Sequence, residues 1–245
     1  MTQQEESHPT THGGASFATT MWSVVLAARD GDAGGEQALD RLCRTYWRPI
    51  YAYLRRDGYS PSDAEDLTQG FLASLIARNS MSAVGPERGR FRSFLLASLR
   101  HFVSDQRDHA NALKRGGGQK IISLEGETPE AFYARQASTD ETPERLFDRH
   151  WAETVLERAQ ARLKEECDRA GKADLYRDLG PAAERTRSHG EIGAAHGMSE
   201  NAVRLAAFRL RQRYQELVRA EIRETVSNDA QLEEEIRYLL QAFSR

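Results

Sequence analysis

Cysteine is scarce in this chain of 245 residues, and the two that occur, Cys43 and Cys167, stand far apart without a cluster of metal-ligand spacing around them. A disulfide framework and a zinc site are therefore not expected. Long apolar runs are also missing, so no segment has the length of a transmembrane helix, and the polar start Met1–Gly14 lacks the features of a signal peptide. We expect a cytoplasmic protein that is not attached to a membrane.

Motifs of catalysis and phosphate binding are lacking as well. Gly116-Gly117-Gly118 neither follows a strand nor precedes a Gly-Lys-Ser/Thr ending, and it is interpreted as a helix stop and a flexible joint. Histidines and acids occur without metal spacing and without a nucleophile motif. We expect no catalytic residue, no metal site and no cofactor, and an enzyme is the least favoured of the functional hypotheses.

The net charge of -3 conceals an uneven distribution of charge along the chain. Arg88–Lys120 contains eight basic residues and two acidic ones, whereas Ser123–Glu157 contains nine acidic residues and three basic ones. A polyanion would bind the first segment and would be repelled by the second.

Apolar residues recur at helical spacing, and we predict an all-α protein of two helical domains joined by a flexible acidic linker. A disordered tail is expected over 1–16 and the first domain over 17–115, with a short helix from about Thr20 to Arg29, a longer one ending at Gly58, and one from about Arg90 to Leu113. Pro49 should kink the longer helix or split it in two. The last of these helices is expected to bury Phe91, Leu95, Leu99 and Phe102.

The linker is expected over 116–142 and the second domain over 143–226. Pro143 and Glu144 indicate the first turn of a helix that carries Leu146, Phe147, Trp151 and Val155. A C-terminal helix is expected over 227–245, with Leu232, Ile236, Leu239, Leu240 and Phe243 on one stripe. Packing of this helix on its own domain is the favoured interpretation, and a regulatory helix that binds a partner is the alternative.

A helix that begins at Ser60-Pro61 presents a face suited to a partner. Ser60 can cap the first turn, Pro61 suits the first helical position, and the acids near the start complement the helix dipole. Leu67, Phe71, Leu75 and Ile76 form the expected buried stripe, while the opposite face carries Asp63, Asp66, Gln69, Gly70, Ala73 and Ala77. Acids at one end of a face of small residues allow another chain to come close, although they also serve simply to stabilise the first turn.

Ser188–Val203 has the layout of a helix-turn-helix. Gly193 lets the two helices touch, Gly197 permits the turn and Ser199 caps the second helix. Val203 packs the second helix against the first. Gly193 lowers helix propensity relative to alanine, and His196 stands where an apolar side chain is usually buried. The exposed start of the second helix would enter the major groove of DNA, whereas the alternative is an ordinary helical hairpin.

In combination, the acidic helix, the basic helix that begins Gly89-Arg90-Phe91-Arg92-Ser93-Phe94-Leu95-Leu96, the linker and the terminal helix-turn-helix resemble the extracytoplasmic-function (ECF) group of bacterial sigma factors, in the sigma-70 family. The resemblance extends from about Trp22 to Leu240. It implies a transcription initiation factor that binds core RNA polymerase and directs it to promoters through the minus-ten and minus-thirty-five elements. A further partner class in keeping with the resemblance is an anti-sigma factor or another regulator.

Asp63–Gln69 is similar to the region-two motif of that family, which docks on the clamp helices of the beta-prime subunit. The polymerase-binding residues that this implies are Asp63, Glu65, Asp66, Gln69 and Gly70. The basic helix resembles the segment that melts and holds the minus-ten element, and Glu191–Arg213 resembles region four, which reads the minus-thirty-five element and meets the beta flap. The DNA-binding residues implied are Arg90, Arg92, Phe94, Arg100, Arg107, Lys114, Ser199, Glu200, Asn201, Arg204, Phe208, Arg209 and Arg211.

The main alternative is a stand-alone helix-turn-helix regulator that binds an operator as a dimer and does not bind polymerase. The acidic helix favours the sigma-factor hypothesis, because a repressor has no need for such a face.

Overall fold

The computed structural model describes residues 35–77, 90–112, 129–134, 140–184, 186–226 and 228–243, and every regular element in these ranges is an α-helix. The all-α prediction is therefore confirmed for this part of the chain. The expected tail over 1–16, the helix at 20–29, Lys114 and the glycine triplet at 116–118 lie outside the described residues.

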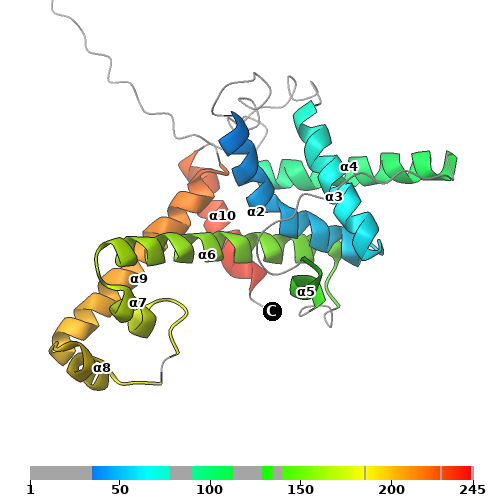
Figure 1. Ribbon diagram of the computed structural model, residues 1–245. Helices are drawn as coiled ribbons and strands as arrows, with labels where there is room; N and C mark the ends of the chain where they lie inside the picture. Colours follow the sequence, from blue (N-terminus) through cyan, green and yellow to red (C-terminus); the bar gives the residue numbers. More distant parts are fainter. Residues whose placement is uncertain are drawn as a thin grey trace, which may run out of the picture.

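Helix α2 spans Gly35–Arg56, α3 spans Pro61–Ala77, α4 spans Phe91–Ala112 and the short α5 spans Pro129–Ala134. Next come α6 (Pro143–Arg169), α7 (Ala173–Leu179), α8 (His189–His196), α9 (Glu200–Arg223) and α10 (Asp229–Ala242). Helix α6 is the longest of these and crosses the molecule, with α2–α5 towards its start and α7 and α8 towards its end (Figure 1).

The boundaries of the first helices follow from local chemistry. Helix α2 ends before Gly58, whose φ of 98° is a conformation that glycine adopts without strain. The Ser60 hydroxyl accepts a hydrogen bond from the backbone N–H of Asp63 at 3.2 Å, so the predicted cap of α3 is confirmed. Pro49 lies inside α2 without dividing it, so of the two outcomes predicted for this helix, a kink or a split, the split is wrong. Burial of Pro49 and its neighbours in the core holds the helix together there.

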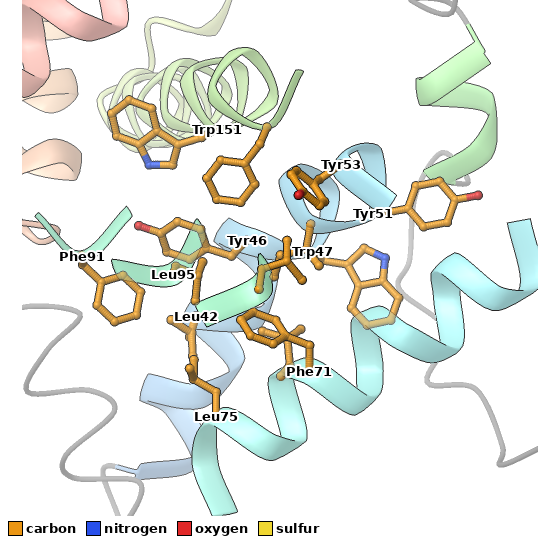
Figure 2. Packing of buried hydrophobic residues seen from close by; sticks show 14 of the residues in the cluster. Leu42, Tyr46, Trp47, Tyr51, Tyr53, Phe71, Leu75, Phe91, Leu95 and Trp151 are labelled. Carbon is orange, nitrogen blue, oxygen red and sulfur yellow. The ribbon is translucent and has the colours of Figure 1, made fainter. Parts of the chain in front are cut away.

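The main hydrophobic core gathers aromatic and aliphatic side chains from α2, α3, α4 and α6 (Figure 2). Tyr46 and Phe91 have ring centroids 5.4 Å apart, and Phe71 and Phe102 have centroids 5.5 Å apart, both in tilted geometries that aromatic pairs prefer. The predicted stripe of α4 is buried: Phe91, Leu95, Leu99 and Phe102. In α3, Phe71 and Leu75 are buried as expected, and Leu67 is half-buried.

This core crosses the expected domain boundary. Phe147 and Trp151 of α6, Ile222 of α9 and Leu239 of α10 belong to the same cluster as the residues of α2–α4. A smaller cluster of Ala159, Leu163, Cys167 and Leu217 lies further along α6, and Val218 packs against both clusters. The expected arrangement of two domains is therefore not confirmed, since α6 takes part in both clusters.

Helix α5 lies within the segment that the sequence predicted to be loop-like. Its Glu130 accepts hydrogen bonds from Arg55 Nε at 2.8 Å and Nη2 at 2.9 Å, and from the Tyr51 hydroxyl at 2.5 Å. The hydrogen bond from Arg55 lowers the pKa of Glu130 below its usual value, and the bond from Tyr51 adds to this. A paired carboxylate therefore attaches this part of the expected linker to α2.

Glu130→Gln should lower the melting temperature at pH 7, because it removes the charge that pairs with Arg55. Glu130 has a lower pKa in the folded chain than in the unfolded one, so its contribution to stability is present above the usual value of 4.5 and is lost as the pH falls through the lower, folded value. The difference between variant and wild type in thermal unfolding should therefore shrink between pH 7 and pH values well below 4.5. Glu165→Gln, at an exposed pair, is the control and should change little. An equal difference at both pH values would contradict the ionic role of Glu130.

Candidate functional site

The helix pair α8–α9 is closed by caps at both starts. The Ser188 hydroxyl accepts from the Glu191 N–H at 3.3 Å while the Glu191 carboxylate accepts from the Ser188 N–H at 2.7 Å, a complete capping box. Gly197 ends α8 with a φ of 65°, and the Ser199 hydroxyl accepts from the Ala202 N–H at 3.2 Å at the start of α9. Ile192 and Val203 are buried between the helices. The two helices, the turn and the cap of the second helix that were expected over Ser188–Val203 are present.

The backbone of the turn comes very close to α8 at Gly193. A Cβ atom at this position would lie 2.6 Å from the carbonyl oxygen of Met198 and 3.5 Å from a methyl group of Val203. The same turn is fixed by a hydrogen bond of 2.8 Å from the Met198 N–H to the Gly193 carbonyl. Glycine therefore costs some helix propensity here but allows a contact that alanine obstructs.

His196 is held by a carboxylate at the place where an apolar side chain was expected. His196 Nε2 lies 2.7 Å from Asp178 Oδ2, and Arg187 Nη1 lies 3.2 Å from the same oxygen. The hydrogen bond with His196 lowers the pKa of Asp178, and Arg187 acts in the same direction. Asp178 thus connects the end of α7 to the helix pair, a role for which the sequence pattern gives no indication.

The solvent side of α9 carries the residues expected to meet DNA. Ser199, Glu200, Asn201 and Arg204 are exposed at its start, and Arg204 forms an ion pair with Glu200 one turn earlier. Leu205 and Phe208 are exposed large apolar residues on the same helix. Arg209 and Arg211 are exposed further along, and no ion pair of either is found among the described residues. The start of α9 therefore presents a mixed polar, basic and apolar surface.

The predicted outward face of α3 is exposed in part, and Ala77 at its end lies outside the residues whose burial is described. Asp63, Asp66, Gly70 and Ala73 are exposed and Glu65 is half-buried. Gln69 is half-buried, and its amide nitrogen is buried without a hydrogen-bond partner in the described ranges. A Cβ atom at Gly70 would lie 3.6 Å from the ring of Phe102, an ordinary contact, so part of this position faces α4. The acidic end of this face is therefore open to solvent.

Two arginines of α4 are exposed and paired. Arg100 Nη2 lies 2.8 Å from Glu144 Oε1 of α6. Arg107 Nη2 lies 2.6 Å from Asp57 Oδ2, and its Nε donates to the Tyr59 hydroxyl at 3.1 Å. Phe94 is half-buried against the core, with its ring centroid 6.1 Å from that of Phe91. These residues border solvent, but their side chains are already engaged within the chain.

Arg92 is buried, with 4% of its surface exposed, among residues of three helices. Its Nη1 donates to Asp148 of α6, while its Nε and Nη2 donate to the two oxygens of Glu235 of α10 at 3.1 Å and 3.2 Å. The guanidinium carbon lies 4.1 Å from the centroid of the Tyr238 ring. In this conformation Arg92 has no surface that DNA could contact.

Arg90, Asp148 and Tyr238 complete this buried group. Arg90 Nε lies 3.1 Å from Glu235 Oε1, and the Tyr238 hydroxyl donates to Asp148. Burial raises the pKa of Asp148, and the charge of Arg92 opposes that shift. We call Arg90, Arg92, Asp148, Glu235 and Tyr238 the buried charge cluster. From the sequence, Arg90 and Arg92 were expected to bind DNA, and the other three residues were not predicted to belong to any site.

An open groove lies between the end of α6, α7 and α9. It has a volume of about 280 Å³ and is lined mainly by apolar groups, among them Leu163, Tyr176 and Leu210, with Arg209 and Arg213 at its edge. Arg213 is bound to Glu166 by two hydrogen bonds of 2.9 Å and 2.8 Å.

Among the described residues, no group of histidine, cysteine and acidic side chains could hold a metal ion. None of the helices in those ranges has the length and apolar character needed to cross a membrane. Comparisons with family models, with curated proteins and with solved structures find no match to this chain.

Gly193→Ala should destabilise the chain, because the added Cβ meets the Met198 carbonyl and the turn must shift, at a cost of about 1 to 3 kcal/mol. Gly190→Ala, on the same helix, is the matched control: the atoms nearest to its Cβ would lie 3.9 Å and 4.0 Å away. The control should be neutral or stabilising by up to about 1 kcal/mol, since alanine is the better helix former. Urea unfolding of both variants measures the difference. Equal stabilities would contradict the close contact.

Proposed function

We propose that this protein is a transcription initiation factor of the ECF sigma type, which binds bacterial core RNA polymerase in the cytoplasm and directs it to specific promoters. The observation that carries the proposal is the occurrence, in one helical chain, of a capped helix-turn-helix with a basic exposed second helix and a separate helix with an exposed acidic face. A DNA-binding module alone accounts for the first feature and not for the second.

In this proposal the start of α9 enters the major groove at the minus-thirty-five element. Ser199, Glu200, Asn201 and Arg204 come within reach of base edges, as the first turns of a recognition helix do. Arg209 and Arg211 contact DNA phosphates, and Phe208 contacts DNA or the beta flap. The exposure of these side chains supports the assignment.

The acidic face of α3 docks on the beta-prime clamp through Asp63, Glu65 and Asp66, with Gln69 and Gly70 beside them. Helix α4 then captures the minus-ten element as a single strand, with Arg100 and Arg107 along the backbone of that strand and Phe94 as a stacking surface. Lys114, which lies outside the described residues, is proposed as a further contact to the same backbone. Both arginines are exposed and their ion pairs are open to exchange with phosphate. We also propose that 17–115 and 143–226 act as two separate domains joined by 116–142 once polymerase is bound.

The alternative is a dimeric regulator that binds an operator without polymerase. The exposed Leu205 and Phe208 on α9 favour it to the extent that they could form a dimer contact. Size-exclusion chromatography of the free chain separates the two proposals, because a sigma factor is expected to be monomeric.

In vitro transcription with purified core polymerase, with and without the protein, is the decisive experiment. Core polymerase should initiate at defined sites when the protein is added.

Asp66→Lys should weaken binding to core polymerase, by a few kcal/mol if the contact with the clamp excludes water and by under about 1 kcal/mol if it stays exposed. Asp66 is exposed in the free chain, so the fold should be preserved. A pull-down on core polymerase measures the effect, with the triple reversal of Asp63, Glu65 and Asp66 as the stronger variant. Glu165→Lys, at an exposed position on α6, controls for the change in net charge. Unchanged binding of the triple variant would refute docking through α3.

Arg204→Ala should alter which minus-thirty-five bases are preferred, with a cost of about 1 to 3 kcal/mol at the contacted base pair. Arg211→Ala should weaken binding evenly across sequences and reduce the salt slope by about one. Selection from a randomised promoter library compares the two variants. If Arg211→Ala changed the preferred sequence and Arg204→Ala did not, the opposite face of α9 would be the one in the groove.

A further inference from the structure

The buried charge cluster joins three helices through charges that lie on their apolar faces. Arg92 lies three residues before the buried Leu95 of α4, Asp148 three residues before the buried Trp151 of α6, and Glu235 three residues after the buried Leu232 of α10. Glu235 is 1% exposed. Charges are costly at such positions unless they are paired, and the partners here come from helices that are far apart in the sequence.

The contact between Arg92 and Glu235 has the geometry of phosphate recognition. Nε and Nη2 of Arg92 donate in parallel to the two oxygens of one carboxylate, at 3.1 Å and 3.2 Å. A guanidinium binds a phosphate through the same pair of N–H groups. Arg90 reaches the same carboxylate at 3.1 Å. Glu235 therefore occupies the position that an oxyanion of a nucleic acid backbone would take on these two arginines.

The stability of α10 comes from the helices on which it packs. This helix has 14 residues, a length at which an isolated helix is marginal in water, so it depends on its contacts with α6 and α9. Leu240 is 62% exposed, so the predicted apolar stripe of α10 is only partly buried. A contact that buries ion pairs also holds a helix less firmly than one that buries apolar side chains alone.

We propose that α10 is an autoinhibitory element, in which Glu235 stands in for a DNA phosphate and keeps Arg90 and Arg92 from single-stranded promoter DNA until α10 moves away. This inference rests on the proposed function, because it names the regulation of the surface of α4 that is assigned to the minus-ten element. Glu144 pairs with Arg100 at the exposed part of α4 and would compete with a phosphate in the same way. The competing explanation is that α10 only braces the core.

The test uses the full chain and an end-labelled single-stranded oligodeoxynucleotide of mixed sequence, with binding followed by fluorescence anisotropy. Glu235→Gln keeps the shape of the side chain and removes its charge, so α10 should be released more readily. We expect DNA to bind about tenfold more tightly, as for one added charge-assisted contact. The dependence of log K on log salt should become steeper by about 0.7 for each phosphate newly bound. Glu234→Gln, on the exposed side of the same helix, is the matched control and should bind like the wild type.

Two further variants separate inhibition from bracing. Adding Arg90→Gln to Glu235→Gln should remove most of the gain in DNA affinity, because Arg90 is one of the two arginines that would bind the phosphate. Arg90 is half-exposed, so the fold should tolerate its loss. Tyr238→Phe removes only the hydrogen bond to Asp148 and should give a smaller gain in the same direction. Melting curves establish that each variant is folded. If neither Glu235→Gln nor Tyr238→Phe binds DNA more tightly than the wild type, α10 is a brace and the inference is overturned.

A pull-down of the wild-type chain on core polymerase, run in parallel, keeps the two proposals distinguishable. Failure of the wild type to bind core polymerase counts against the proposed function, whatever the DNA measurements give. If the wild type binds core polymerase but Glu235→Gln does not raise the affinity for DNA, the result counts against autoinhibition and not against the proposed function.

Discussion

Neutralisation of Arg92 is the constraint on which the arrangement of the helices depends. A guanidinium at this position in the core is tolerated only while anionic groups lie against it, and in this structure these groups are the carboxylates of Asp148 and Glu235. Removing one partner from such a group typically costs about 3 to 5 kcal/mol, since the remaining charge stays buried. Helices α6 and α10 must therefore approach α4 in one register. This requirement, together with the apolar contacts of Phe147 and Trp151, draws the helices on both sides of the expected linker into one core.

The uneven charge of the sequence has its counterpart in the fold. The acidic segment that includes the start of α6 was expected to repel a polyanion, and in the folded chain it lies against basic residues of α2 and α4. Arg92 pairs with Asp148, Arg100 with Glu144 and Arg48 with Glu157. Opposite charges that are separate in the sequence are thus brought together in space. In the proposed function, a nucleic acid would have to compete with carboxylates of the chain itself for the arginines of α4.

Local features of the site could be predicted from the sequence, and long-range partners could not. Caps and turns depend on residues three or four positions apart, so Ser60, Gly197 and Ser199 indicated their helix boundaries directly, whereas the capping box at Ser188 was not predicted. Apolar periodicity indicated which face of α4 is buried, but it carries no information on which helix covers that face. The sequence does contain a sign that Arg92 is buried, because Arg92 lies three residues from the buried Leu95. Acidic residues lie at the same spacing from buried residues on α6 and α10. Helix α5 was missed because six residues are too few for a periodic pattern.

Helix α6 connects the two hydrophobic clusters as one continuous helix. Its 27 residues make a rod of about 40 Å, with Asp148 near one end and Leu163 and Cys167, which pack under α9, towards the other. A tilt of about 5° at the end near the helix pair displaces the opposite end by about 3 Å, which is as long as a hydrogen bond. Phe147 and Trp151 flank Asp148 on the same helix and are buried, so a displacement of this size at Asp148 would also move side chains of the main hydrophobic core.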